Sequence, residues 1–174
     1  TLLNTVTKSD VLSEHKLFAT LDPSSRRMRF PNEKEVVFVD TVGFIRELPK
    51  ELLNAFRATL EEVGEADLLL HIVDATSREL LHQIQVVNDT LSGLGFGEKP
   101  KILVLNKCDL LSAPELGSLG NLVSSEFSAF EKVLQVSAVT REGIEEMLLS
   151  VQERLMEYFT GQDPGRFLEI GSMP

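Results

Sequence analysis

Apolar residues in this chain gather in short, nearly unbroken runs. The clearest runs are Asp67–Val73 and Lys101–Leu105, and Glu35–Val39 is a third run that ends at Asp40. A weaker run covers residues 133–136. Strands buried on both faces of a parallel sheet have this continuous apolar character, so the four runs predict parallel strands.

Helical spacing dominates the stretches between these runs. Apolar residues recur every three or four positions over 53–63, 80–91 and 144–155. Ser112, followed by Pro114 and Glu115, is typical of a helix start, and Thr76 with Glu79 predicts a capping box before the second helix. Alternating strands and helices predict the α/β fold class with a mostly parallel sheet.

Composition narrows the class of protein. The 174 residues carry 17 Lys and Arg against 27 Asp and Glu, a formal charge of −10, which argues against direct binding to nucleic acid by this chain alone. A single cysteine fits a reducing compartment, so we expect a cytoplasmic protein. No apolar run reaches the roughly 20 residues of a membrane span. We expect a monomer whose one domain covers residues 1–160, with 161–174, where Gly and Pro increase, as a linker or the start of a C-terminal segment.

Polar motifs follow three of the predicted strands, and ligands of parallel α/β sheets bind at that edge. Asp40-Thr41-Val42-Gly43 offers a carboxylate that can hold Mg²⁺ through water and a glycine that lets the backbone approach a phosphate. Asn106-Lys107-Cys108-Asp109 offers a carboxylate for the N–H groups of guanine and a lysine stem that can lie along the base. The backbone of Ser137-Ala138 is placed to contact the guanine carbonyl.

Each motif alone could be a structural feature without a ligand. For example, an Asp at a turn that is followed by a glycine, as in Asp40–Gly43, is common in proteins. Their occurrence in this order, each at a strand end, favours a nucleotide site over a flavodoxin-like or receiver domain, which would leave the Asn106–Asp109 motif unexplained. His15, His71 and His82 lack metal-ligand spacing. For Cys108 we expect a packing role, and for Asp74 a cap on the following turn.

The order of these motifs resembles that of the translation-factor-related GTPases. The stretches Leu17–Pro23 (LFATLDP), Asp40–Ile45 (DTVGFI) and Ala55–Glu62 (AFRATLEE) resemble the HflX branch, a group of ribosome-associated GTPases, and the resemblance runs from Thr1 to about Phe159. It implies a three-layer P-loop GTPase fold, hydrolysis of GTP to GDP with Mg²⁺, and binding to the ribosome, chiefly its large subunit.

The resemblance also implies a set of site residues, none of which we assign as catalytic. Thr20 would bind Mg²⁺ directly and Asp40 through water. The GTP-binding residues would be Phe18, Ala19, Thr20, Leu21, Asp22, Asp40, Thr41, Val42, Gly43, Asn106, Lys107, Cys108, Asp109, Ser137, Ala138 and Val139.

One departure from this family concerns the phosphates. The motif G-x-x-x-x-G-K-[ST], which cradles them, does not occur, and Thr1–Asn4 resembles the segment that follows it. We therefore expect the first strand, which in this fold lies between the strands at 35–39 and 67–73, to be missing as well, and the chain to be part of a longer protein. The alternative is an interaction module that works without nucleotide, or a non-functional fragment.

Overall fold

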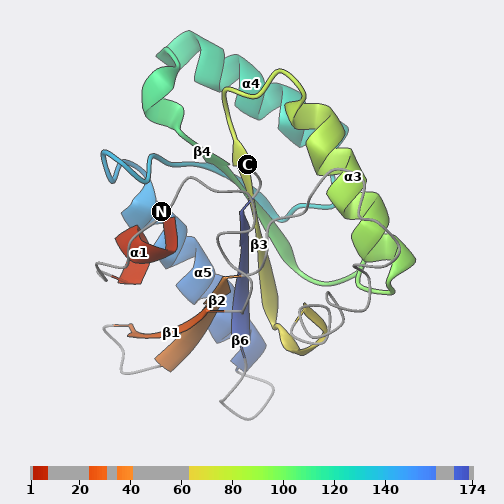
Figure 1. The fold of residues 1–174 in the computed structure, drawn as a ribbon, viewed down its shortest axis with the longest axis vertical. Coiled ribbons are helices and arrows are strands. Elements are labelled where there is room, and N and C mark those ends of the chain that lie inside the picture. The colour runs from red at the N-terminus through yellow and green to blue at the C-terminus, as the bar shows by residue number, and fades with distance from the viewer. Residues whose placement is uncertain (1, 8–23, 31–34, 41–62, 160–166, 173–174) are drawn as a thin grey trace.

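A six-stranded sheet with helices on both faces forms the structure (Figure 1). The computed structural model describes residues 2–7, 24–30, 35–40, 63–159 and 167–172. Its elements are α1 (Leu2–Thr7), β1 (Ser24–Arg29), β2 (Glu35–Asp40), β3 (Leu68–Asp74), α3 (Leu80–Gly93), β4 (Lys101–Asn106), the 3₁₀ helix η1 (Cys108–Leu110), α4 (Ala113–Glu126), β5 (Lys132–Gln135), α5 (Ile144–Phe159) and β6 (Phe167–Ser172).

The strands follow the order β1-β2-β6-β3-β4-β5. All neighbours are parallel except β1, which runs antiparallel to β2 at the edge. The four strands expected from apolar runs are present within one residue of their predicted ends, and the α/β class with a mostly parallel sheet is confirmed. The carboxyl ends of β2, β3 and β4 therefore lie toward the same edge of the sheet.

Strand β6 occupies the position between β2 and β3, where the sequence predicted a gap. Phe167 is in register with Val37 on one side, and Leu168 with Leu68 on the other. We expected residues 161–174 to form a linker or the start of a C-terminal segment, because Gly and Pro are frequent there and no strand-like alternation is visible in their sequence. Residues 167–170 pair with β2 and residues 168–172 pair with β3, and this pairing satisfies backbone groups of β2 and β3 that face the position.

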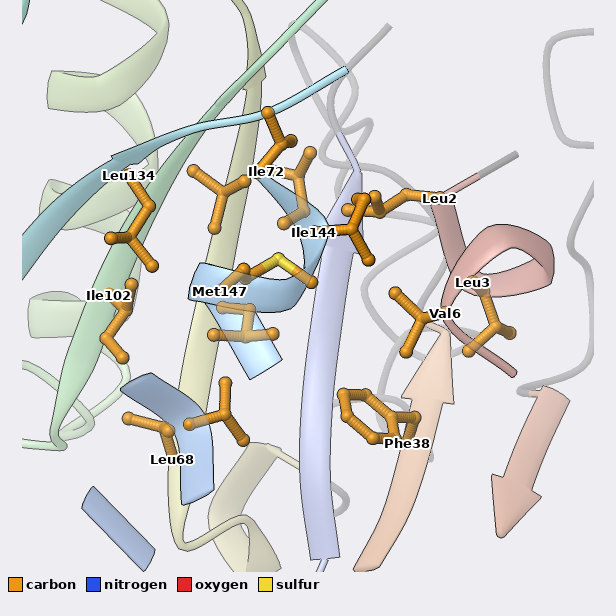
Figure 2. Close-up of a cluster of buried hydrophobic side chains, with 14 of the residues drawn as sticks. Leu2, Leu3, Val6, Phe38, Leu68, Ile72, Ile102, Leu134, Ile144 and Met147 are labelled. Atoms are coloured by element: carbon orange, nitrogen blue, oxygen red, sulfur yellow. The ribbon is translucent and has the colours of Figure 1, made fainter. Parts of the chain in front are cut away.

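Two hydrophobic layers bury the sheet. Helices α1 and α5 cover one face, where Leu2 and Val6 of α1 and Met147 of α5 join a cluster with Phe38, and Figure 2 shows these side chains meeting over the strands. Helices α3 and α4 cover the other face through a second cluster that includes Ile84. No helix in the described part of the chain combines the length and apolar character that crossing a membrane requires.

The helix starts agree with the sequence at one of two places. Ser112 is the N-cap of α4, and the carboxylate of Glu115 accepts hydrogen bonds from its backbone N–H (2.8 Å) and hydroxyl (2.5 Å), which confirms the predicted start. The predicted box of Thr76 and Glu79 is wrong, because α3 has Glu79 itself as N-cap. Thr76 instead donates its backbone N–H and hydroxyl to Asp74.

A buried histidine lies in the middle of β3. His71 is 6% exposed, its ring packs 5.6 Å from that of Phe130, and neither ring nitrogen has a hydrogen-bond partner among the described residues. Burial, with a smaller contribution from the charge of Lys101, lowers the pKa of His71 to about 3. The side chain is therefore neutral in the folded protein, and it serves as a packing residue.

This histidine should make the fold sensitive to acid. Because the folded pKa of His71 lies below the unfolded value of 6.5, the unfolded chain binds the proton more tightly, so stability falls as pH drops below 6.5. Between pH 7.5 and pH 5 we expect this residue to cost about 2 kcal/mol of unfolding free energy. Urea unfolding of wild type and His71→Leu at both pH values measures it. His82→Gln, at an exposed position of α3, is the control and should retain the wild-type pH dependence.

The central position of β6 gives a second test. Ile170→Pro removes a backbone donor from a strand paired on both sides, so we expect the 174-residue chain to lose at least about 1–3 kcal/mol of stability. Ile170→Val keeps the donor and the branched side chain and is the matched control. Equal urea midpoints for the two variants would contradict the placement of β6.

Candidate functional site

The ends of β3 and β4 form the frame of the candidate site. Asp74 and Asn106, the last residues of these strands, are in register as neighbours. On the far side of β4, the segment after β5 is tied to the same frame, since the N–H of Val136 donates to Leu105 (2.8 Å) and the N–H of Cys108 donates to Val136 (3.1 Å). The structure thus joins the predicted base-recognition segments, 106–109 and 137–138, along one edge.

Asn106 links these two segments through its side chain. Its Oδ1 accepts hydrogen bonds from the backbone N–H of Lys107 (2.8 Å) and from that of Ala138 (3.1 Å). The side chain therefore fixes the turn after β4 and the position of the Ser137–Ala138 backbone at once. In this site Asn106 acts as a scaffold.

Lys107 adopts a backbone conformation that few residues other than glycine accept. Its φ of 67° lies in the left-handed region, which for a residue with a Cβ is costly unless its surroundings hold it. The Nζ atom of Lys107 lies 2.6 Å from Oδ2 of Asp74 and forms an ion pair with it. Two bonds therefore hold Lys107: Asn106 accepts its backbone N–H, and Asp74 accepts its side-chain ammonium group.

Asp74 has two roles, of which the sequence indicated one. Its Oδ1 accepts the N–H (2.9 Å) and the hydroxyl (2.7 Å) of Thr76, which is the predicted cap on the next turn, while Oδ2 accepts from Lys107. Burial raises the pKa of this carboxyl, but the hydrogen bonds from Lys107 and Thr76 outweigh it and hold the pKa below its ordinary value. Asp74 is therefore ionised at neutral pH.

The other two residues of the 106–109 motif differ in exposure. Cys108 is buried, its Sγ lies 3.0 Å from the carbonyl of Leu105, and burial raises the pKa of its thiol, so the expected packing role agrees with the structure. Asp109 in η1 is exposed, which leaves its carboxylate accessible to a ligand.

Hydrogen bonds around Ser137 hold the loop after β5 in one conformation. Ser137 is fully buried, its N–H donates to Glu142, and its carbonyl accepts from Arg141 (2.8 Å). Its hydroxyl accepts from the N–H of Thr140 (3.0 Å). These bonds close a tight turn and present the buried Ala138 and the 77%-exposed Val139 at the edge of the site.

Helix α1 contacts this loop directly. The hydroxyl of Thr5 donates to the carbonyl of Ala138 (2.9 Å), and the guanidinium of Arg141 donates to the carbonyl of Thr5 (3.0 Å). Residues from the first ten and from the last forty positions therefore meet beside the predicted base pocket.

The remaining predicted site residues lie outside the described residues. They are Phe18, Ala19, Thr20, Leu21, Asp22, Thr41, Val42 and Gly43; Asp40 is described only through its backbone. Asp40 is the last residue of β2 and is in register with Ile170 of β6, which is in register with Leu70 of β3. Because β3 continues from Leu70 to Asp74, β2 ends before β3 does along the sheet. Within the described ranges no cluster of three or more His, Cys, Asp or Glu could hold a metal ion.

The sequence analysis missed three features of this site: the contact made by Thr5, the positive φ of Gly143, and the ion pair of Asp74 with Lys107. Gly143 carried a readable signal, because it stands directly before the first apolar residue of a predicted helix. Thr5 and the pair carried none, since their partners are distant in sequence.

The fold, with its two predicted base-recognition segments side by side, is that of the P-loop GTPases, and comparison with known proteins specifies the family. The family of 50S ribosome-binding GTPases matches residues 1–107, and the chain belongs to it. Within that family it is an HflX-type sequence. It is 44% identical over 157 residues to the GTPase HflX of Caldanaerobacter subterraneus subsp. tengcongensis, covering 90% of this chain and 34% of the relative. It is 40% identical over 155 residues to that of Escherichia coli, covering 89% and 35%.

Solved structures agree with the fold. A GTP-binding protein from Sulfolobus solfataricus in complex with GDP matches with a TM-score of 0.70 and 26% identity, over 90% of this chain and 48% of that one. Era, in complex with MgGDPNP and a segment of 16S ribosomal RNA, matches with a TM-score of 0.75 and 22% identity, over 88% and 51%. The chain spans about a third of the length of the curated relatives it matches.

The loop after β5 gives a prediction about Gly143. Its φ is +70°, and a Cβ there would lie 2.0 Å from the carbonyl oxygen of Gln135. Gly143→Ala should therefore cost more than about 2 kcal/mol of stability. Gly117→Ala is the control, because apart from its own stretch of α4 no described atom lies within 4 Å of the Cβ position, and alanine favours helix by about 0.5–1 kcal/mol. Thermal unfolding measures both, and a Gly143→Ala variant as stable as Gly117→Ala would refute the geometry.

Proposed function

We propose that this chain is the guanine-nucleotide-binding part of a GTPase that hydrolyses GTP to GDP and phosphate. The observation that carries the proposal is the link made by Asn106, whose Oδ1 accepts from Lys107 and Ala138 and so joins two segments suited to contact one guanine. The match to 50S ribosome-binding GTPases over residues 1–107 supports it.

Base recognition follows from the chemistry of the joined segments. The exposed carboxylate of Asp109 is an acceptor suited to the two N–H groups on the Watson–Crick edge of guanine. The alkyl stem of Lys107 would offer an apolar surface to the base, and the backbone of Ser137-Ala138 would face the guanine carbonyl. Adenine has a donor where guanine has that carbonyl, so the same set would reject it.

At the phosphate end the proposal depends on residues beyond those described. Thr20 and Asp40 would hold Mg²⁺, directly and through water, and Gly43 would approach the γ-phosphate. Hydroxyl and carboxylate oxygens suit this ion, which would neutralise charge on the phosphates. Hydrolysis of this kind depends on positioning rather than on a covalent intermediate, so no catalytic residue is assigned.

The partner we propose is the ribosome, chiefly its large subunit, with the chain acting as a monomer in the cytoplasm. The family description and the HflX names of the relatives support this choice. The charge of −10 makes extensive contact with RNA phosphates by this chain alone unfavourable. A nucleotide-independent interaction module remains the alternative, favoured by the lack of the G-x-x-x-x-G-K-[ST] motif in these 174 residues.

Asp109 tests the guanine specificity. In the full-length protein, Asp109→Asn presents a donor to the base N–H groups, so the affinity for GTP should fall by about one to two decades while xanthosine triphosphate, with a carbonyl in place of the amine, should gain. Competition binding with GTP, ATP and xanthosine triphosphate measures the change.

Asp89→Asn, at an exposed carboxylate of α3, is the control and should retain the wild-type order of affinities for the three nucleotides. An unchanged preference for GTP in Asp109→Asn would overturn the assignment, and absence of GTP binding by the wild type would favour the interaction module.

A further inference from the structure

We propose that Asp74 is a positioning residue for nucleotide binding, which fixes the Lys107 side chain in the place where the guanine base is received. The inference rests on the proposed function and extends it to a residue outside the base-recognition motifs. Asp74 touches no base in this proposal and acts only through Lys107.

The geometry gives the pair a fixed frame. Asp74 and Asn106 end two neighbouring parallel strands in register, so the carboxylate and the lysine that follows Asn106 start from adjacent points of the sheet. The Nζ–Oδ2 distance is 2.6 Å, in the range of a charge-assisted hydrogen bond. The ion pair thus joins two residues that are 33 positions apart, at the sheet edge that carries the candidate site.

The carboxylate divides its two oxygens between two tasks. Oδ1 is held by the N–H and hydroxyl of Thr76, which fixes the orientation of the carboxyl plane, and Oδ2 is left for Lys107. The side chain of Asp74 is 16% exposed, whereas that of Lys107 is 51% exposed. A shielded, oriented anion therefore holds a cation whose stem still faces solvent and any incoming ligand.

Holding Lys107 has a consequence for affinity. Lysine has a long, flexible stem whose freedom would otherwise be lost when a base packs against it, and ordering it beforehand reduces that loss. The left-handed backbone of Lys107 sets where its stem begins, and the ion pair sets where it ends. A partly exposed ion pair contributes little to stability, so its removal should affect binding more than folding.

The experiment uses the full-length protein and a double-mutant cycle. Asp74→Asn has the same shape and keeps an acceptor for Thr76 but loses the charge that holds Lys107. We expect the Kd for fluorescently labelled GDP to rise about tenfold, mainly through faster dissociation, with little change in the single-turnover rate of GTP already bound. In a Lys107→Met background, which itself weakens binding, Asp74→Asn should have no further effect.

Thr76→Val is the matched control within the same turn. It removes the hydroxyl bond to Oδ1 but leaves the Thr76 backbone bond and the Lys107 ion pair, so the Kd should stay within about twofold of wild type. The inference is overturned if Asp74→Asn binds GDP like wild type, if Thr76→Val weakens binding equally, or if the losses from Asp74→Asn and Lys107→Met simply multiply. Wild-type protein that binds no GDP would instead overturn the proposed function itself.

Discussion

One side-chain oxygen, Oδ1 of Asn106, determines the arrangement on which the rest of the site depends. It accepts two backbone N–H groups, one from the residue after it and one from Ala138 in the loop beyond β5. This acceptor joins the left-handed turn at Lys107 to the loop at 137–143, beside the backbone bond from the Cys108 N–H to the Val136 carbonyl. The apolar sheet beneath holds the strand that carries Asn106, so this amide and the backbone bonds beside it connect the site to the core.

Unusual backbone conformations gather beside this amide. Lys107 and Arg141 are the non-glycine residues with positive φ in the described ranges, and Gly143 joins them. Each is held by hydrogen bonds of the two loops, and Arg141 also binds α1 through Thr5. Local strain is thus concentrated where a ligand would bind, while the strands and helices around it adopt ordinary geometry, a distribution typical of binding sites.

Much of the fold was predictable from sequence because its strands are buried on both faces. Runs such as Lys101–Leu105 have no polar alternation, and the motif residues follow their ends directly. Strand β1 was missed, since its sequence SSRRMR is polar and only pairing with β2 at the sheet edge makes it a strand. The capping box at Thr76 was wrong because Asp74, two residues earlier, accepts the Thr76 N–H that the box would have given to Glu79.

The site was predictable only as far as its motifs were local. The segments 106–109 and 137–138 follow from strand ends, and the structure joins them. The ion pair of Asp74 with Lys107 and the contact of Thr5 with Ala138 depend on strand register and helix packing, which no short stretch of sequence contains. The residues predicted to bind phosphate and Mg²⁺, from 18 to 22 and from 41 to 43, stay predictions.

The position of β6 has a consequence for how the 174-residue chain, when synthesised by itself, reaches its fold. Among the described strands, β2 and β3 are joined only through β6, so in the 174-residue chain the sheet is two separate pieces until residues 167–172 pair. On a translating ribosome these residues emerge after every other described element. Until then, β2 and β3 each expose a row of unpaired backbone groups that other chains could pair with. Such late, long-range closure slows folding, because much of the chain must be ordered before the last strand contributes any stabilising contact.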